Sequence, residues 1–247
     1  MVKQIPKKLK KEPLVEAIWE LRFSSSRPSI PELLPGLIYG AIGASYPKVE
    51  RLPTAKLPST ILHQDPALRY IPTVRLVGDP YSILMGEHVV TLSCRRPYRG
   101  WDEFESKILE LVRMLNEAGL IDKPERFSLK YINLISFDNG ATLEPLDVDL
   151  KIGSHELTSR PVHLRTEVKE DEFLHVIQIA SPANIKLSPK EHLSGILVNI
   201  DTIFKPTRND FWSGFDNLLR KAHLLSKNWF FNNILKDDTI ERFEPEY

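Results

Sequence analysis

Apolar and polar residues alternate near the beginning of the chain. Between residues 15 and 23 the odd positions are apolar, whereas Glu16, Glu20 and Arg22 lie between them. A period of two places neighbouring side chains on opposite faces of an extended chain, so this segment predicts a half-buried strand. Similar runs, bounded by turn residues, predict further strands at 69–77, 81–85, 88–93, 127–137, 162–168, 173–180 and 196–204.

Two other segments have the spacing of amphipathic helices. In residues 101–115 apolar side chains recur at steps of three and four, acidic residues occupy the first turn, and Gly119 is placed to end the helix. A second long helix is expected over residues 209–235, with Asn209 or Asp210 as its N-cap.

The connections between these elements are less regular. Residues 31–46 are mostly apolar and compatible with a helix, although their prolines and glycines weaken it. Several prolines make residues 47–66 a long irregular connection, and residues 138–160 are also loop-like.

The order of expected elements repeats along the chain as strand, connection, three strands and helix. Both long helices open with Trp-x-x-Phe, Trp101 with Phe104 and Trp212 with Phe215, and the two tryptophans are interpreted as core anchors. The apolar stripes of both helices need a facing sheet. We therefore expect an α+β fold of two related halves, 13–124 and 125–247. Each half would pack one long helix on a mostly antiparallel sheet, as in a TATA-binding-protein-like or ferredoxin-like duplication.

Composition and charge narrow the class of protein. The 247 residues include 33 basic and 33 acidic side chains, so the formal net charge is zero, which disfavours a protein that coats DNA through a global positive field. No apolar run is long enough to span a membrane. Residues 1–12 carry five lysines and no secretory signal pattern, and they predict a mobile basic arm. A cytoplasmic protein is expected.

Signatures of common catalytic sites are absent from the sequence. It contains no glycine-rich phosphate loop and no nucleophile elbow, and a single cysteine, Cys94, excludes a multi-cysteine zinc site. We therefore expect no cofactor and no metal. His163 and His175 lie on neighbouring expected strands, and Asp201 has apolar neighbours, so an undetected enzyme site around His175 and Asp201 stays an alternative. His223, within the last helix, is interpreted as structural.

The most distinctive local feature is the segment from Arg95 to Trp101. It brings arginines and aromatic residues between a strand and a helix N-terminus, a setting suited to an anion or a stacked base. In the competing interpretation, Trp101 is a core anchor, Tyr98 packs beside it, and the arginines pair with acidic residues of the first helical turn. The candidate contacts for an anion or a nucleic acid are Arg95, Arg96, Tyr98, Arg99, Lys7, Lys8, Lys10 and Lys11.

Several motifs carry a resemblance to a known family. The run Pro13-Leu14-Val15-Glu16-Ala17, the motif Tyr98-x-Gly100-Trp101-x-x-Phe104, the run Lys130-Tyr131-Ile132-Asn133 and the step Ala222-His223 with Phe230 occur in this order. Together they resemble a sporadically distributed prokaryotic family of functionally uncharacterised proteins, in which arginine is commoner at the position of Lys130. The resemblance implies no catalytic residues. It implies an accessory protein of a mobile or defence-associated locus.

Three functions are compatible with the sequence, and the first is favoured. It is a non-catalytic protein-interaction or regulatory module whose partner is another protein, with no membrane association. The second is a nucleic-acid-binding protein that uses the lysine arm and the Arg95–Trp101 segment, and the third is an enzyme. An exposed apolar patch would favour the first, a continuous positive strip the second, and a deep pocket around His175 and Asp201 the third.

Overall fold

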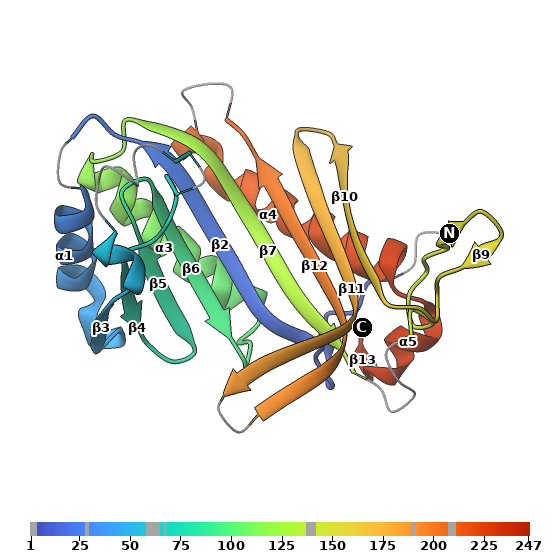
Figure 1. Cartoon of the computed structure of the whole chain (residues 1–247). Helices are drawn as coiled ribbons and strands as arrows, with labels where there is room; N and C mark the ends of the chain where they lie inside the picture. The colour runs from blue at the N-terminus through green and yellow to red at the C-terminus, as the bar shows by residue number, and fades with distance from the viewer. Residues whose placement is uncertain are drawn as a thin grey trace. The chain divides into compact units, whose positions relative to one another are not determined.

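The computed structural model describes residues 4–27, 30–57, 65–66, 68–136, 142–188, 191–206 and 211–247. It is a mixed α+β protein in which a large, mostly antiparallel sheet is accompanied by a few helices (Figure 1). This confirms the expected fold class. The strands of the largest sheet follow the order β10-β11-β12-β7-β2-β6-β5-β4-β3.

The chain divides into two compact units. The terminal unit comprises Met1–Val15, Lys130–Ile203 and Arg220–Tyr247, and the central unit comprises Glu16–Leu129 and Phe204–Leu219. Because each unit combines separate stretches of chain, these boundaries differ from the expected halves, 13–124 and 125–247.

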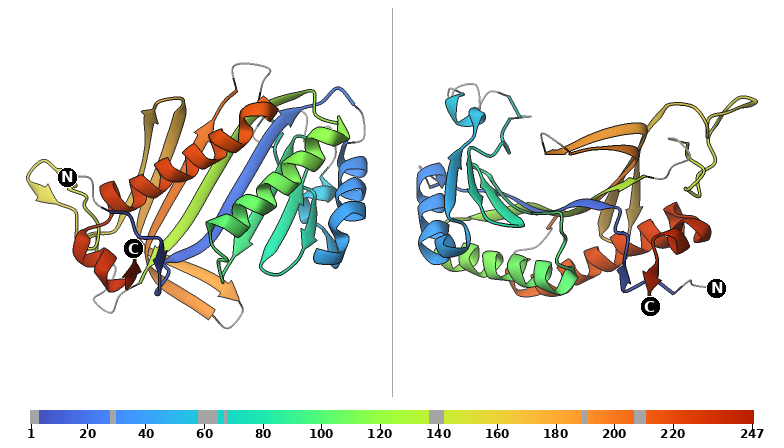
Figure 2. Two further views of the ribbon diagram at one scale, coloured as in Figure 1. Left: turned by 180° about the vertical axis from the view of Figure 1, so that it is seen from behind. Right: turned by 90° about the horizontal axis from the view of Figure 1, so that it is seen from below.

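The central unit contains most of β2 and the strands β3 to β6. The register aligns Trp19 with Leu92, Leu92 with Ile83 and Ile83 with Leu76, and all four side chains are buried. The helix α3 packs on this face (Figure 2). Its Phe104 ring stacks with Tyr81, and the ring centroids are 6.4 Å apart. The elements are β2 (Leu14–Ser24), α1 (Ile30–Ile42), β3 (Lys48–Arg51), β4 (Val74–Val77), β5 (Tyr81–Met85), β6 (Val89–Arg95), α3 (Trp101–Ala118), the beginning of β7 (Lys123–Ile135), and the 3₁₀ turns η1 (Gly43–Ser45) and η2 (Pro53–Lys56).

The terminal unit contains the rest of β7 and the strands β10 to β12. Its apolar core joins β11 and β12 to the helical turns near the C-terminus, with Ile179, Val198 and Phe230 among its buried members. The elements are β10 (Val162–Glu170), β11 (Phe173–Ser188), β12 (Glu191–Phe204), the end of α4 (Phe211–Asn228), the π-helix η3 (Trp229–Ile234), α5 (Asp237–Arg242), and the two-stranded sheets β1 (Lys8–Leu9) with β13 (Pro245–Glu246) and β8 (Lys151–Ile152) with β9 (His155–Glu156).

Most expected elements are present, with altered bounds. The connection 47–66 contains β3 and η2, and the loop-like residues 138–160 contain the β8–β9 hairpin. The expected helix 209–235 is interrupted, since α4 ends at Asn228 and continues as a π-helix. The proposed caps Asn209 and Asp210 lie outside the described residues. None of the described helices is long and apolar enough to cross a membrane.

Residues 8–11 of the expected N-terminal arm lie against the C-terminal segment. β1 pairs with β13, so that Lys8 lies opposite Glu246 and Leu9 opposite Pro245. Leu9 is buried in the core of the terminal unit, and Lys11 forms an ion pair with Glu244 at 2.7 Å. A single apolar side chain and a backbone partner from the other end of the chain thus hold the segment in place.

The interpretation of Trp101 and Trp212 as core anchors is wrong, because both side chains are only half-buried. Phe211 and Phe215 occupy the buried stripe of α4, and Trp212 is rotated around the helix by about 100° from Phe211 and about 60° from Phe215. The fully buried tryptophan is Trp19 of β2, whose ring meets Phe215 edge-on at 5.9 Å.

Candidate interaction surfaces

Arg95 ends β6 in the central unit. The register places it opposite Glu16, and its Nε lies 3.4 Å from Glu16 Oε1. The same carboxylate accepts a hydrogen bond from the Ser93 hydroxyl. The charge of Arg95 is therefore offset by Glu16 on the neighbouring strand, and not by the acidic residues of the first helical turn that the sequence suggested.

Residues 96–101 connect this strand to α3. Arg96 and Arg99 are exposed, whereas Tyr98 is half-buried and packs edge-on against Phe104 at 6.0 Å. This contact agrees with the packing interpretation of Tyr98. Trp101 is half-buried at the first helical position, so it is neither a full core anchor nor a free stacking platform.

The lysines of the N-terminal segment lie in the terminal unit beside acidic residues. The backbone N–H of Lys7 donates to the Glu246 carbonyl at 2.7 Å, and that of Lys10 donates to the Glu244 carbonyl at 3.2 Å. These bonds bring the backbone of the lysine-bearing segment alongside Glu244 and Glu246, and the Glu244 carboxylate forms the ion pair with Lys11. The positive charge of this segment is consequently reduced.

The residues of the suggested enzyme site are not brought together. His163 is exposed and lies opposite Ala180, whereas His175 lies opposite Val168, so four residues of β10 separate the two positions. His175 Nδ1 contacts Thr202 Oγ1 at 3.0 Å. Because neighbouring residues of a strand face opposite sides, Asp201 points away from His175. The grouping of His175 with Asp201 is therefore incorrect.

His175 is completely buried beside Glu170 and Trp229. Its Nε2 lies 3.5 Å from Glu170 Oε2, which accepts a hydrogen bond from Trp229 Nε1 at 2.7 Å. Burial lowers the pKa of His175, although the Glu170 carboxylate opposes this shift. The imidazole is neutral at physiological pH, and it has a structural role in this environment.

Two residues from the family-like motifs meet in the terminal unit. Tyr131 Oη lies 2.8 Å from His223 Nδ1, which joins β7 to α4. Burial, with a smaller contribution from the Lys227 charge, lowers the pKa of His223 to about 3. A neutral imidazole can accept a hydrogen bond from the Tyr131 hydroxyl at Nδ1, so this contact holds α4 against β7.

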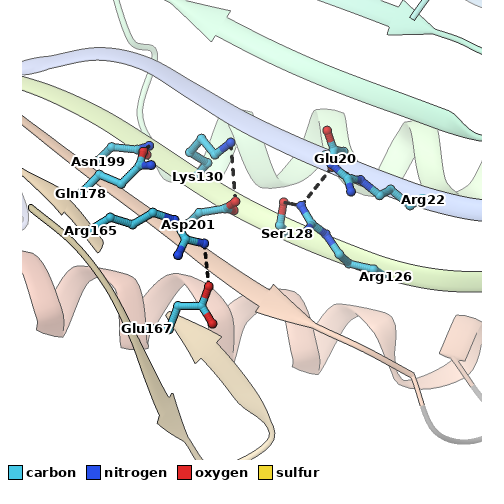
Figure 3. Close-up of polar contacts among 10 residues, drawn as sticks. All are labelled: Glu20, Arg22, Arg126, Ser128, Lys130, Arg165, Glu167, Gln178, Asn199 and Asp201. Carbon is cyan, nitrogen blue, oxygen red and sulfur yellow. Dashed lines mark hydrogen bonds and ion pairs between the residues drawn. The ribbon is translucent and has the colours of Figure 1, made fainter. Parts of the chain in front are cut away.

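The sheet face opposite the buried histidines is polar in the terminal unit (Figure 3). Lys130 Nζ lies 3.5 Å from Asp201 Oδ2, and Asn199 donates to Gln178 at 2.8 Å. Arg165 and Glu167 form an ion pair along β10. The four charged side chains in these contacts thus pair with one another.

The same kind of face occurs in the central unit (Figure 3). Glu20 accepts hydrogen bonds from Arg22 at 2.6 Å and from Arg126 at 3.1 Å. The Arg22 guanidinium also lies over the Tyr70 ring, 4.5 Å from its centroid. The contacts of Glu20 with Arg126 and of Arg22 with Tyr70 were missed because their members are far apart in the sequence, although the even positions of 15–23 indicated a polar face.

A concentration of exposed apolar residues distinguishes the region around α1 and β3. Only Ile30, Leu34 and Ile38 of α1 are buried, and they pack toward β4 and β5. The sequence predicts a mostly apolar helix here and does not indicate which of its faces is exposed. The exposed side chains, called the 33–57 apolar surface below, are Leu33, Leu37, Tyr39, Val49 and Leu57.

A cavity of about 310 Å³ lies in the central unit. Asp65, Arg69, Glu87 and His88 provide its charged and polar lining, and neither His175 nor Asp201 contributes to it. Within the described ranges, no three His, Cys, Asp or Glu side chains are grouped closely enough to hold a metal ion.

Comparison with known proteins adds no assignment. No protein-family model matches the chain, and no curated protein matches it.

Proposed function

We propose that this chain is a non-catalytic protein-interaction module whose protein partner docks on the 33–57 apolar surface. Five of the eight exposed large hydrophobic residues in the described part of the chain lie between Leu33 and Leu57. Isolated exposed apolar residues are ordinary, whereas a contiguous group marks an interaction surface, and we infer from their closeness in sequence that these residues contribute to such a group. This concentration is the observation that supports the proposal.

The chemistry of α1 fits an apolar partner surface. Glu32 is its single charged residue, and Leu33 and Leu37 stand one helical turn apart on its outer side. Nothing lies within 4 Å of the positions that a Cβ would take at Gly36 and Gly40, so a partner can approach this backbone closely. We expect the partner to contribute apolar side chains and no dense charge.

The two alternative functions have less support. Arg95 and Lys11 have carboxylate partners, which reduces the field available to a nucleic acid. His175 is neutral and faces away from Asp201, which removes the acid–base pair on which the enzyme hypothesis depended.

We also infer that the chain contains two related halves, as a TATA-binding-protein-like duplication would. In each half the first strand neighbours the fourth, giving β2-β6-β5-β4 and β7-β12-β11-β10, and an 18-residue helix follows. An experimental structure tests this directly. Superposing the two sets of strands should superpose α3 on α4, and helices on opposite faces would reject the duplication.

We also propose that the chain belongs to the sporadically distributed prokaryotic family that its motifs resemble. The hydrogen bond between Tyr131 and His223 gives two of its motifs a shared structural purpose. An accessory role in a mobile or defence-associated locus is consistent with a module that lacks its own chemistry.

The test of the interaction function compares matched substitutions. Leu33→Asp/Leu37→Asp alters the apolar surface, whereas Leu224→Asp alters a more exposed leucine of the terminal unit. Tagged wild type and both variants are purified from the native host, and the recovered proteins are quantified by mass spectrometry. We expect a specific protein to be lost with the double variant and kept with Leu224→Asp. Recovery of the same proteins with both variants would reject this docking surface.

A second measurement addresses nucleic acid. Binding of single- and double-stranded DNA and RNA is measured at physiological salt with wild type and an Arg95→Ala/Arg96→Ala/Arg99→Ala variant. We expect only weak binding. Sub-micromolar binding that collapses in the variant would replace the protein-interaction proposal with the nucleic-acid function.

A further inference from the structure

The strand β3 ends the order of the largest sheet, and no other described strand pairs with its outer edge. Its inner edge pairs with β4, where Leu52 N–H donates to the Thr73 carbonyl at 2.8 Å. In the antiparallel register Lys48 lies opposite Val77 and Glu50 opposite Arg75. Hydrogen-bonding pairs alternate along such a ladder, so the backbone groups of Val49 and Arg51 point outward.

The side chains of β3 are sorted onto two faces. Val49 lies opposite Leu76, on the face where α1 packs, and it is 51% exposed. Lys48 and Glu50 share the other face, where Lys48 Nζ lies 2.6 Å from Glu50 Oε1. The edge therefore presents an apolar side chain on one face and a pair of opposite charges on the other.

We propose that two copies of this chain associate through β3, with the strands antiparallel about Val49. In this arrangement the outward N–H and carbonyl of Val49 bond to those of Val49 in the second copy. The outward N–H of Arg51 donates to the Pro47 carbonyl of the second copy. Lys48 lies opposite Glu50 of the second copy, and Glu50 opposite Lys48.

The charges of β3 favour a second copy of the same strand as its partner, and they favour one pairing register. Shifting the strands by one residue would place Lys48 opposite Arg51 of the second copy, which puts like charges together. It would also require the backbone groups of Glu50, which are directed at β4. The register about Val49 pairs the outward backbone groups and also places Lys48 opposite Glu50. Both conditions are met because the two paired strands have the same sequence.

The expected association is weak. β3 has four residues, so its pairing buries less surface than a standard protein interface, and a micromolar dissociation constant follows. This self-association shares Val49 with the 33–57 apolar surface, but it needs no other protein. Its test uses the purified chain alone, so either proposal can fail while the other stands.

The test is a charge exchange followed by sedimentation velocity over micromolar concentrations. Lys48→Glu alone and Glu50→Lys alone each place like charges opposite each other twice, and each should weaken dimerisation about tenfold or more. The double variant Lys48→Glu/Glu50→Lys restores opposite charges, and so does an equimolar mixture of the two single variants. We expect both to recover the wild-type dimer.

Two controls separate association from folding. Lys151→Glu reverses a lysine of the exposed β8–β9 hairpin, and it should leave the dimer unchanged. Val49→Pro removes an outward N–H without removing a bond to β4, and it should abolish the dimer while the circular dichroism spectrum is retained. A monomeric wild type, single variants that dimerise normally, or an exchange that fails to restore the dimer would each overturn the proposal.

Discussion

The interiors of the two units bury different kinds of ionisable group. In the central unit these are the phenols of Tyr46 and Tyr81 and the thiol of Cys94, and burial raises the pKa of each. In the terminal unit burial lowers the pKa of the His175 and His223 imidazoles and of the Lys227 ammonium, and the Asp201 carboxylate is also buried. The two interiors therefore respond to opposite ends of the pH scale.

The physical reason lies in the ordinary pKa of each group. Phenols and thiols are neutral below about pH 8, so burying them costs nothing electrostatic over the physiological range. An imidazole has an ordinary pKa of about 6.5, so a buried one opposes its own protonation just below neutrality. We expect loss of buried apolar volume and alkaline pH to lower the stability of the central unit. We expect acidic pH to lower the stability of the terminal unit.

The largest expected effect is on the aromatic interior of the central unit. Trp19→Ala should lower the free energy of unfolding by about 3–5 kcal/mol, because the ring is fully buried and contacts Phe215. Trp212→Ala, at a half-buried position, should cost about 1 kcal/mol. Urea unfolding followed by circular dichroism measures both, and equal losses would contradict the assignment of Trp19 as the core tryptophan.

The next effect concerns acid and the terminal unit. Below pH 6.5 the unfolded state protonates His223, whereas the folded state keeps it neutral until about pH 3, so stability falls as the pH is lowered between these values. From pH 6 to pH 4.5 this group should remove about 2 kcal/mol. His175 acts in the same direction. His223→Gln should flatten the pH dependence, and His163→Gln, at an exposed position, should not.

An alkaline titration addresses the central unit. Burial raises the pKa of Tyr46 to about 12, so the stability contributed by its neutral phenol is complete below pH 10 and is lost as the pH rises toward 12. Between pH 10 and pH 11 the loss should be about 1 kcal/mol. Unfolding of Tyr46→Phe measured at both pH values should show a smaller decrease. An unchanged decrease would remove Tyr46 from the alkali-sensitive groups.

The smallest effect is expected on the polar sheet face of the terminal unit. Arg165→Ala should change stability by less than about 0.5 kcal/mol, since its ion pair with Glu167 is about half exposed. Lys130→Ala should cost more, about 1 kcal/mol, because Asp201 is largely buried and loses a charged neighbour. Equal effects would show that burial of Asp201 has no energetic consequence.

The sequence by itself determined the elements whose pattern is local. The alternation in residues 15–23 and the apolar stripe of residues 101–115 became β2 and α3, because strand and helix periods depend only on neighbouring residues. The sequence also predicted that the even positions of residues 15–23 form a polar face. The sequence indicated that the long helices needed a sheet, and α3 packs on one.

Only the tertiary structure decided which residues meet and which faces stay exposed. The contacts of Tyr131 with His223 and of Lys8 with Glu246 join residues far apart in the chain. The exposure of Leu33 beside the burial of Leu34 depends on where α1 packs. Such outcomes follow from strand register and helix placement, and a shift of one residue would reverse the face of every side chain. The local pattern carries no information about that choice.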